Sequence, residues 1–344
     1  MAQRSQEGQF GIRTQAAKGT YDDPGALDSG VFYDILGGSL TPQREFIVAD
    51  PEIGGTRDTT AAALTTVVSQ GDVESYGYLN ALATLLGGCL GDSSTSDDTN
   101  HYTHTITQLD SGELPWLSIE EGVGQDFETF NHTDARVNTM NLSAEPNGYL
   151  MMTAGLAAIT TTAGNTRTDL TMSPGSTNLD ASPLIVGPEI VITYDSASVC
   201  AKSFSLDINN NMELDDFCMG DIEVDTFTPK QREVTSGLSI RPDTSALWRE
   251  AVFGAAGATA AVSGGVDIND LVITMTSTSL VQRGDNLAPY KVVVTIPSAF
   301  VEPFEVSPSG DDVIETDFVI RALRPSAGTD LITVAIDTGQ DAVR

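Results

Sequence analysis

The sequence has few basic residues for its length. Its 344 residues include 17 Lys and Arg against 48 Asp and Glu, which gives a formal net charge of −31. A surface of this sign repels nucleic-acid phosphates and anionic lipids. We therefore do not expect the protein to wrap DNA or bind a membrane through basic patches. The charge is compatible with an acidic wall that lets DNA slide past.

Cysteine is also scarce. Cys89, Cys200 and Cys218 are too few and too scattered for a disulfide framework or a CxxC metal site, so we expect them to be reduced and mostly buried. No apolar run approaches the ~20 residues of a membrane span, and residues 1–7 lack the apolar core of a signal peptide. These absences predict a soluble protein that is made in a cytoplasm and has no membrane partner.

Patterns that carry enzyme chemistry are missing too. Of the three histidines, His101 and His104 are spaced so that a strand points them to opposite faces, which argues against a shared metal site and favours positions facing solvent. No nucleophile elbow, phosphate-binding loop or dinucleotide-binding glycine pattern occurs. We expect no catalytic residue, no metal and no cofactor, and therefore no enzyme.

One acidic stretch, Asp207–Asp216, has the alternating oxygen ligands of a calcium loop. Met212 stands where such a loop needs glycine, and Cys218 stands where it needs a bidentate glutamate. The simpler interpretation is a polar loop between two strands, with asparagine side chains that stabilise the turn. The sequence does not decide whether this loop binds an ion.

Short stretches rich in β-branched and aromatic residues dominate the chain and predict strands. Two stretches predict helices instead. In residues 72–86 apolar side chains recur at helical spacing, and Gly87 and Gly88 are expected to end that helix. Residues 243–253 form the second, with Asp243 or Thr244 as its cap and Gly254 at its end.

A short sequence echo suggests an internal duplication. Ser39–Val48 and Phe227–Val234 both contain Thr-Pro, then Arg-Glu, then residues that favour strands. We predict a mainly β protein of two sandwich-like or barrel-like units with one short helix each, plus an extended N-terminal arm and loops. The expected boundaries are 1–30 for the arm, 31–160 for the first unit, 161–183 for a linker or exposed loop, and 184–344 for the second unit.

Several separated blocks resemble the tail tube (major tail) proteins of long, flexible-tailed bacteriophages. The resemblance spans roughly residues 10–245, and beyond them it is mainly one of strand pattern. The blocks are Ala16–Thr20, Leu40–Glu45, Ala49–Arg57, Gly71–Glu74, Leu117–Glu121, Ser205–Asn210 and Thr228–Glu233.

The resemblance implies a structural protein of the virion tail that is assembled in the host cytoplasm. Subunits of this family form rings whose inner strands join into one β-barrel, and the stacked rings form a conduit for DNA ejection. The implied partners are further copies of the chain, the tape measure protein and DNA inside the lumen, and other tail proteins at the tube ends. The arm and the loops at 50–66 and 91–100 are expected to become ordered on a neighbouring ring.

A duplicated chain makes a ring of six units from three copies, so we favour a pseudo-hexameric trimer over a hexamer. Expected subunit or ring contacts include Arg side chains able to form bidentate pairs with facing carboxylates. The alternative is an ordinary exposed strand pair of little energetic weight. The candidate contact residues are Thr41, Pro42, Arg44, Glu45, Arg57, Thr228, Pro229, Arg232 and Glu233.

A second function class is a β-sandwich on a virion or outside a cell that binds glycans or a receptor. A glycan platform needs clustered tryptophan and tyrosine side chains. Only Trp116 and Trp248 occur, and they lie far apart in the sequence. This favours the tail tube interpretation.

Overall fold

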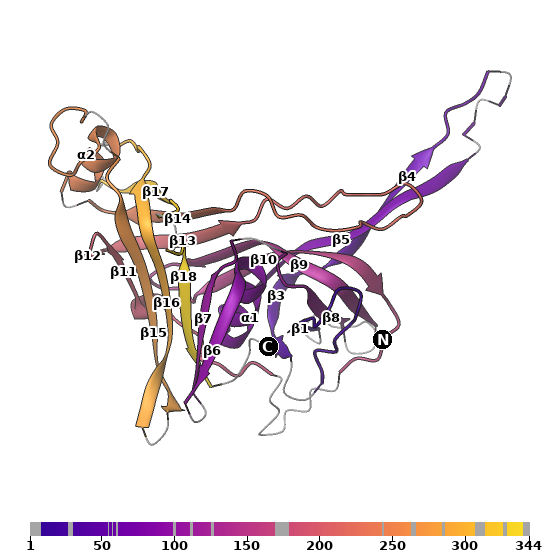
Figure 1. Ribbon diagram of the computed structural model, residues 1–344, viewed down its shortest axis with the longest axis horizontal. Coiled ribbons are helices and arrows are strands. Elements are labelled where there is room, and N and C mark those ends of the chain that lie inside the picture. Colours follow the sequence, from indigo (N-terminus) through magenta and orange to yellow (C-terminus); the bar gives the residue numbers. More distant parts are fainter. Residues whose placement is uncertain are drawn as a thin grey trace.

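The computed structural model describes most of the chain. The residues it describes are 8–26, 30–53, 55–56, 58–59, 61–98, 101–110, 113–124, 127–168, 179–242, 244–262, 266–283, 286–306, 314–325 and 329–339. Strands dominate, as the composition predicts, and the mainly β fold class is confirmed. Figure 1 shows two projections at opposite ends of the body, a hairpin of β4 and β5 at one end and helix α2 at the other.

Seven strands form a continuous antiparallel sheet in the order β4–β5–β10–β9–β13–β14–β17. Side chains of β9 alternate between the core and the opposite face over residues 139–144, as expected for a sheet with one buried face, whereas residues 134–137 are all buried. We call this array the main sheet. Its strands are β4 (Thr41–Val48), β5 (Ala62–Tyr76), β10 (Met151–Thr162), β9 (Glu128–Ala144), β13 (Ala201–Asn209), β14 (Glu233–Ile240) and β17 (Thr316–Ala322).

The short strand β3 (Ile35–Gly38) precedes β4 and also pairs with β5. The other ten strands among the described residues cover the apolar face of the main sheet in two groups. β2 (Val31–Tyr33), β1 (Gln9–Thr14) and β8 (Leu117–Val123) pair in that order, and β8 joins them to β9. The second group joins the main sheet where the end of β16 pairs with β17. Its order is β6 (Gly91–Asp97), β7 (Tyr102–Gln108), β18 (Thr333–Thr338), β16 (Asn286–Val301), β15 (Asn269–Arg283), β11 (Ile190–Tyr194) and β12 (Ala197–Val199).

Helix α1 (Leu79–Leu90) fills the space between these layers, and all twelve of its residues are buried. It packs against β9, β7, β1 and β2. Its first turn is capped by a distant segment, because the Asp180 carboxylate accepts the Ala81 N–H at 2.9 Å and the Ser182 hydroxyl accepts the Leu79 N–H at 2.8 Å. Helix α2 (Ala246–Phe253) ends at Gly254, as predicted, but it begins three residues later than expected, with Ser245 at its N-cap. Of the two expected caps, Thr244 lies one residue too early and Asp243 lies outside the described residues.

The expected first helix was placed too early. Residues 72–76 belong to β5, since Val73 and Ser75 point into the core and pair with β10. Gly87 and Gly88 continue the helix instead of ending it, and a Cβ on Gly88 would lie only 3.2 Å from Leu117 and Val137. The helix ends at Gly91, whose φ of 102° suits glycine.

Three segments expected to be loops or arms are fastened to the body. Within the predicted arm, residues 9–14 form β1, because Phe10 and Ile12 alternate into the core. The polar residues 91–97 form β6, paired with β7. In the predicted linker, Thr168 binds Glu120 and residues 180–182 cap α1, while residues 169–178 lie outside the described part.

The two halves of the chain share backbone pairing and one apolar core. β9 pairs with β13, and β7 pairs with β18. Each half contains a β-hairpin, a helix and a second pair of strands, in that order. In both halves the later strand of the second pair lies beside the later strand of the hairpin. The sets are β4–β5, α1 and β9–β10 in the first half, and β13–β14, α2 and β16–β17 in the second.

The Thr-Pro echo does not mark equivalent places in these sets. Thr41 and Pro42 begin the first hairpin strand, β4, whereas Thr228 and Pro229 precede the second hairpin strand, β14. The common order of strands is therefore independent of the echo. The domain boundaries stay a prediction.

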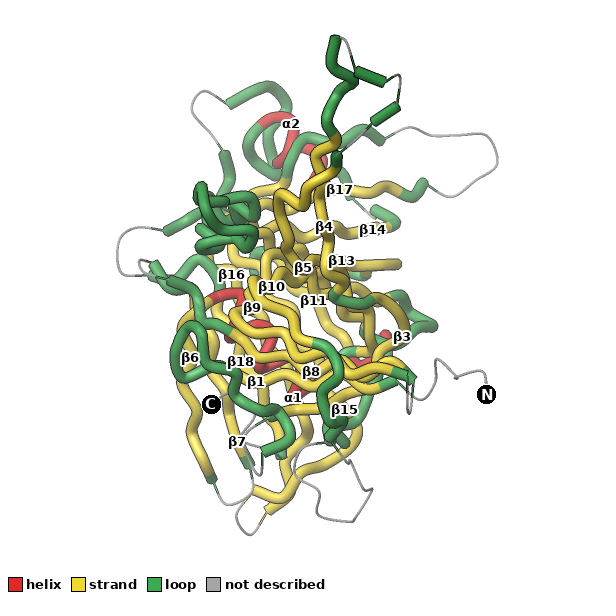
Figure 2. The backbone as a smooth tube through the Cα atoms, turned by 90° about the vertical axis from the view of Figure 1, so that its right-hand side faces the viewer, coloured by secondary structure: helices red, strands yellow, loops and turns green. Residues whose placement is uncertain are grey.

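Figure 2 shows the hairpin of β4 and β5 rising beyond the rest of the sheet. We call the described residues within 44–66 the projecting hairpin. The corresponding connection in the second half, residues 210–232, runs from β13 and β14 back across the first half toward β5 (Figure 1), and we call it the strap. The two connections occupy the same place in the strand order but differ in what they contact.

Candidate functional site

The main sheet has a polar face opposite the core. Residues directly paired across strands share a face, and two adjoining rows of polar side chains or glycine cross the sheet. The first row is Asp72, Gly155, Thr139, Asn209 and Glu233, and the second is Glu74, Thr153, Asn141, Asp207, Thr235 and Arg321.

Acidic side chains outnumber basic ones in these rows. They carry the carboxylates of Asp72, Glu74, Asp207 and Glu233 and the guanidinium of Arg321. The Asn141 side chain donates a hydrogen bond to the Asp207 carboxylate at 2.5 Å, so these two neighbours in the second row bind each other. The face is therefore a wide, hydrogen-bonding and net acidic surface.

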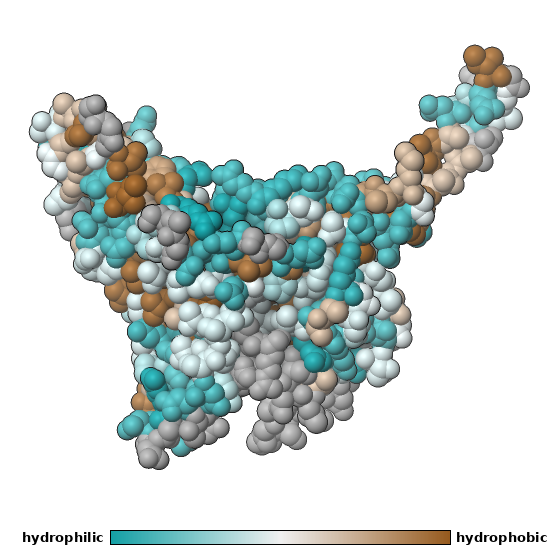
Figure 3. Space-filling model, in the orientation of Figure 1, coloured by the Kyte–Doolittle hydropathy of each residue, from teal (hydrophilic) through white to brown (hydrophobic). Residues whose placement is uncertain are grey.

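The outer edge of β4 has no partner in the described part of the chain, because β4 pairs only with β5. Next to this edge, Phe46 and Ile47 are 57% and 62% exposed, and Val48 is also exposed. Figure 3 shows apolar side chains along the projecting hairpin and at its tip. An open strand edge flanked by exposed apolar side chains is a pairing surface for another chain.

The opposite end of the main sheet is partly open as well. The edge of β17 that faces away from β14 pairs with β16 only at residues 320–322. Two further backbone bonds flank this pairing, from the Glu302 N–H to the Val319 carbonyl and from the Leu323 N–H to the Ser298 carbonyl. β15 pairs with β16 no further than Ala299. The last residues of β16 therefore present a free edge within the described part of the chain.

The candidate contact residues of the first echo lie on β4. Thr41, Arg44 and Glu45 are exposed, and Pro42 is partly buried. The Arg44 guanidinium lies 5.3 Å from the centroid of Phe46, and Glu45 accepts a hydrogen bond from Thr66. Arg57 lies outside the described residues.

The second echo lies elsewhere, at the base of the strap. Arg232 is partly buried, and it donates through Nε to Asn210 Oδ1 at 3.0 Å and through Nη2 to the Leu90 carbonyl at 3.3 Å. Burial lowers its pKa from the ordinary arginine value. Glu233 is exposed and faces Arg321 at 3.8 Å. The structure does not bring the two echoes together within one chain.

A cavity of about 590 Å³ opens beside Arg232, where β14 and β17 separate. Leu109, Leu114, Leu323 and Leu331 are among the apolar residues of its wall. Its basic lining residues are Lys230, Arg232, Arg321 and Arg324, and its acidic ones are Asp110 and Glu233. Four of the 17 basic residues thus meet at one cavity of a strongly acidic protein.

Sequence reasoning missed Arg136, which holds the strap in place. This residue is 1% exposed, lies 3.6 Å from the ring centroid of Trp116, and donates to the carbonyl of Phe227 in the strap and to Glu113 at 3.1 Å. The only sequence feature that could have indicated a buried arginine is its position on β9 between the apolar residues Ala135 and Val137. Trp116 lies under the strap beside Phe227 and is 8% exposed, so it is not available as a glycan platform.

The stretch Asp207–Asp216 behaves as the simpler interpretation predicts. Asp207 ends up on β13, and Asn209 Oδ1 accepts the Asn211 N–H at 2.8 Å while the Asn211 side chain donates to the Gln231 carbonyl. Asn210 is buried and donates to the carbonyls of Cys89 and Val137. The described residues contain no group of three or more potential metal ligands.

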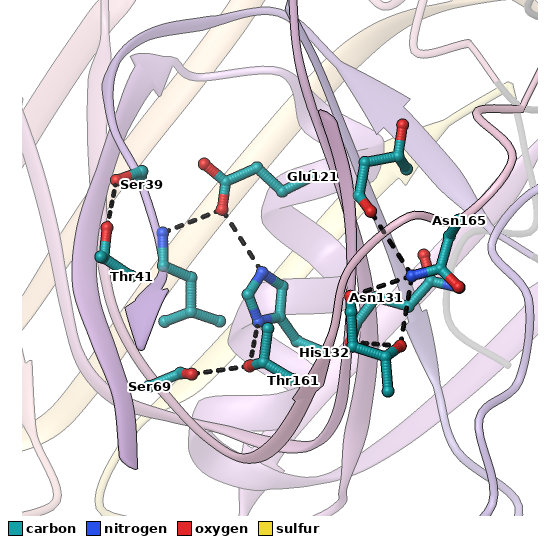
Figure 4. Close-up of polar contacts among 11 residues, drawn as sticks. Ser39, Thr41, Ser69, Glu121, Asn131, His132, Thr161 and Asn165 are labelled. Carbon is teal, nitrogen blue, oxygen red and sulfur yellow. Dashed lines mark hydrogen bonds and ion pairs between the residues drawn. The ribbon is translucent and has the colours of Figure 1, made fainter. Parts of the chain in front are cut away.

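A buried chain of polar groups joins four strands (Figure 4). His132 Nδ1 lies 2.8 Å from Thr161 Oγ1, which lies 2.6 Å from Ser69 Oγ. On its other side, His132 Nε2 lies 3.4 Å from Glu121, which also accepts the Leu40 N–H. The order hydroxyl, histidine, carboxylate in Thr161, His132 and Glu121 is that of a hydrolase triad, but His132 and Glu121 are buried and the Thr161 hydroxyl also binds Ser69. These polar groups therefore fasten β5 and residue 40 to the body.

The other two histidines correct the sequence analysis. His101 and His104 are buried rather than facing solvent. His104 contacts Thr95 at 2.9 Å and Thr338 at 3.2 Å, because β7 lies between β6 and β18 and is covered on both edges. Cys89 is buried as expected, whereas Cys200 and Cys218 are exposed.

The family comparison fits this architecture. Among the described residues, no helix is both long and apolar enough to cross a membrane. No curated protein matches the chain. The family model described as "Phage tail tube protein" matches residues 5–322, which is most of the sequence. The chain therefore belongs to the phage tail tube protein family, whose members are structural components of the virion tail.

Proposed function

We propose that copies of this chain assemble into stacked rings that form the tail tube and that DNA leaves the virion through the lumen. The observation that carries the proposal is the pair of open ends on the main sheet. In the described part of the chain, β4 lacks an outer partner at one end, and at the other end the final residues of β16, which extend the sheet beyond β17, lack one. A ring of copies satisfies both edges without leaving a free strand.

The strand pairing that joins the two halves of one chain indicates how two copies pair with each other. β13, the first hairpin strand of the second half, pairs with β9 of the first half. β4 is the first hairpin strand of the first half, and β16 of the second half corresponds to β9. Repetition of the same contact places β4 of one copy beside β16 of the next copy.

This repeated pairing favours a ring of three copies with pseudo-six-fold symmetry. Each chain supplies two successive sets of hairpin, helix and strand pair, so three chains supply six sets. A hexamer is the alternative, and it would double the number of strands around the axis. The predicted contacts at Thr41, Pro42, Arg44 and Glu45 belong to the edge between copies in either ring.

The polar face of the main sheet is the surface proposed to line the lumen. Its core face is already covered by α1 and the two outer groups of strands, so the polar face is the one that can enclose an aqueous channel. Carboxylates in its rows repel DNA phosphates and prevent sequence-independent adhesion during passage. The tape measure protein occupies the same channel before ejection, other tail proteins contact the tube ends, and assembly takes place in the host cytoplasm.

Electron microscopy of the purified chain tests the assembly. Hollow filaments of uniform width, with a mass per ring equal to three chains, are the expected result. Six chains per ring would refute the trimer, and a protein that stays monomeric at high concentration would refute self-assembly.

A further inference from the structure

We propose that the cavity between β14 and β17 binds the projecting hairpin of a second copy, with its basic residues facing the acidic tip of that hairpin. This inference rests on the proposed self-assembly. It assigns a binding partner to the cavity and a binding site to the hairpin.

The strap shows what such a contact looks like inside one chain. β5 and β10 pair as far as Ser69 and Ala158, and beyond this pair the two strands separate. The strap fills the gap: Val67 N–H donates to the Ile222 carbonyl at 2.8 Å, and Thr160 donates to the Glu223 carboxylate at 3.0 Å. The apolar strap residues Met212, Val224 and Phe227 pack there against Val68, Leu114, Trp116, Ala157 and Ile159.

In the second half, the corresponding gap is open within the part of the chain that the structure describes. β14 and β17 pair as far as Thr235 and Arg321, and beyond this pair lies the cavity. β14 corresponds to β5, and β17 corresponds to β10, in the order of strands. The cavity therefore occupies the place that the strap fills in the first half.

The projecting hairpin is the counterpart of the strap. It connects β4 to β5 as the strap connects β13 to β14, but it points away from its own chain (Figure 1). Its tip carries Ile53, which is fully exposed, and the exposed acids Asp50, Glu52 and Asp58. These acids outnumber the one basic residue of this stretch, Arg57, which lies outside the described residues. The strap likewise places Glu223 beside an apolar cluster.

The charges of the cavity and of the hairpin tip are complementary. Three of the basic residues around the cavity already face carboxylates: Lys230 with Glu213, Arg321 with Glu302, and Arg324 with Asp110. Arg232 differs, because in the described part of the chain it forms no ion pair and donates only to amide and carbonyl acceptors, although the Asp110 carboxylate acts on its charge from beyond ion-pair distance. A desolvated guanidinium of this kind gains most from an incoming carboxylate, and the leucines of the cavity wall suit Ile53.

Disulfide cross-linking between copies tests the contact. In a background that carries Cys200→Ser and Cys218→Ser, one variant carries Ile53→Cys and a second carries Leu323→Cys. The two are mixed, assembled and oxidised, so that a dimer of the two variants can arise only between copies. We expect cross-linked dimers in the assembled mixture and none in either variant alone, since disulfide formation requires close approach of the two Cβ atoms.

A matched control replaces Ile53→Cys with Met219→Cys, because Met219 is equally exposed but lies on the strap. Tubes without the Ile53–Leu323 cross-link would overturn the inference and leave the proposed function standing. Equal cross-linking from Met219 would also overturn it. Failure of the parent chain to form tubes would overturn both this inference and the proposed function.

Charge neutralisation gives a second test that does not depend on cross-linking. Glu52→Gln and Arg232→Gln are each expected to raise the concentration needed for assembly by about fivefold, as for the loss of a single ion pair. The double variant is expected to need no higher concentration than either single variant, because both substitutions remove the same contact. The control is Arg283→Gln, since Arg283 pairs with Asp98 outside the cavity. A double variant whose effect is the sum of the two single effects would contradict the contact.

Discussion

The guanidinium of Arg136 lies 3.6 Å from the ring centroid of Trp116, and the same guanidinium donates to the carbonyl of Phe227. Arg136 belongs to the first half and Phe227 to the strap of the second half. On the other side, Lys18 lies 5.5 Å from the Trp116 centroid and donates to the Asp225 carbonyl. Two cations thus tie the strap to one tryptophan.

Replacement of Arg136 by methionine is expected to destabilise the unassembled protein by about 3 kcal/mol, because it removes a buried cation–π contact and leaves the Phe227 carbonyl without its donor. Urea unfolding measures this change. Arg44→Met is the matched control, since Arg44 makes an exposed cation–π contact with Phe46, and its expected effect is under about 0.5 kcal/mol. Equal effects of the two substitutions would contradict the role assigned to Arg136.

Asp180 is expected to link stability to pH. Burial is the main cause that raises the pKa of its carboxyl, against several hydrogen bonds that lower it. A raised folded-state pKa means that the folded protein holds the proton more tightly, so the ionisation of Asp180 costs stability as pH rises from about 4, the unfolded value, through the folded value.

The comparison with Asp180→Ala isolates this effect. The variant is expected to lose about 2 kcal/mol of unfolding free energy, since the cap of α1 is lost. Its disadvantage should be largest near pH 4 and smaller at higher pH, when urea unfolding is measured across the series. A disadvantage that grows with pH would reverse the sign argued here.

Thiol labelling is expected to separate the cysteines. Burial raises the pKa of the Cys89 thiol to about 12, so it stays protonated and shielded at pH 8. Cys200 and Cys218 are exposed. Mass spectrometry of the unassembled native protein after iodoacetamide treatment should find these two modified and Cys89 unmodified, with all three modified in denaturant. Rapid native labelling of Cys89 would show that the base of the strap opens.

Ile47→Lys is expected to weaken assembly without unfolding the chain. The Ile47 side chain is exposed beside the open edge of β4, and its burial against a second copy is worth about 2 kcal/mol, or roughly 30-fold in the concentration needed for assembly. Light scattering measures that concentration. The control is Leu287→Lys, a similarly exposed residue on β16 away from that edge, which should assemble normally. Normal assembly of Ile47→Lys would exclude the edge as the contact.

The sequence predicted the fold class because strand-forming residues and turn signals are local. It misplaced the first helix because Val73 and Tyr76 fit helical spacing, while Val73 and Ser75 fit the period of a strand equally well. The choice depends on β10, which pairs with residues 69–76 from far along the chain. Gly88 likewise looks like a helix stop until the packing of Leu117 and Val137 against it is known.

The candidate site was predictable only in part. The echo identified β4 and Arg232, which lie at an open edge and at a cavity. It could not identify the polar rows of the sheet, because Asp72, Asn141 and Asp207 come together only through strand register. Arg136 was missed because nothing in its neighbours indicates that a tryptophan lies over it.

Cryo-electron microscopy of the assembled protein tests the central claim most directly. The account predicts a hollow ring of three chains in which β4 of each copy pairs with the end of β16 of the next, and the rows of Asp72 and Glu74 face the channel. A ring in which β4 keeps an unpaired outer edge, or in which the polar face of the main sheet points away from the axis, would contradict it.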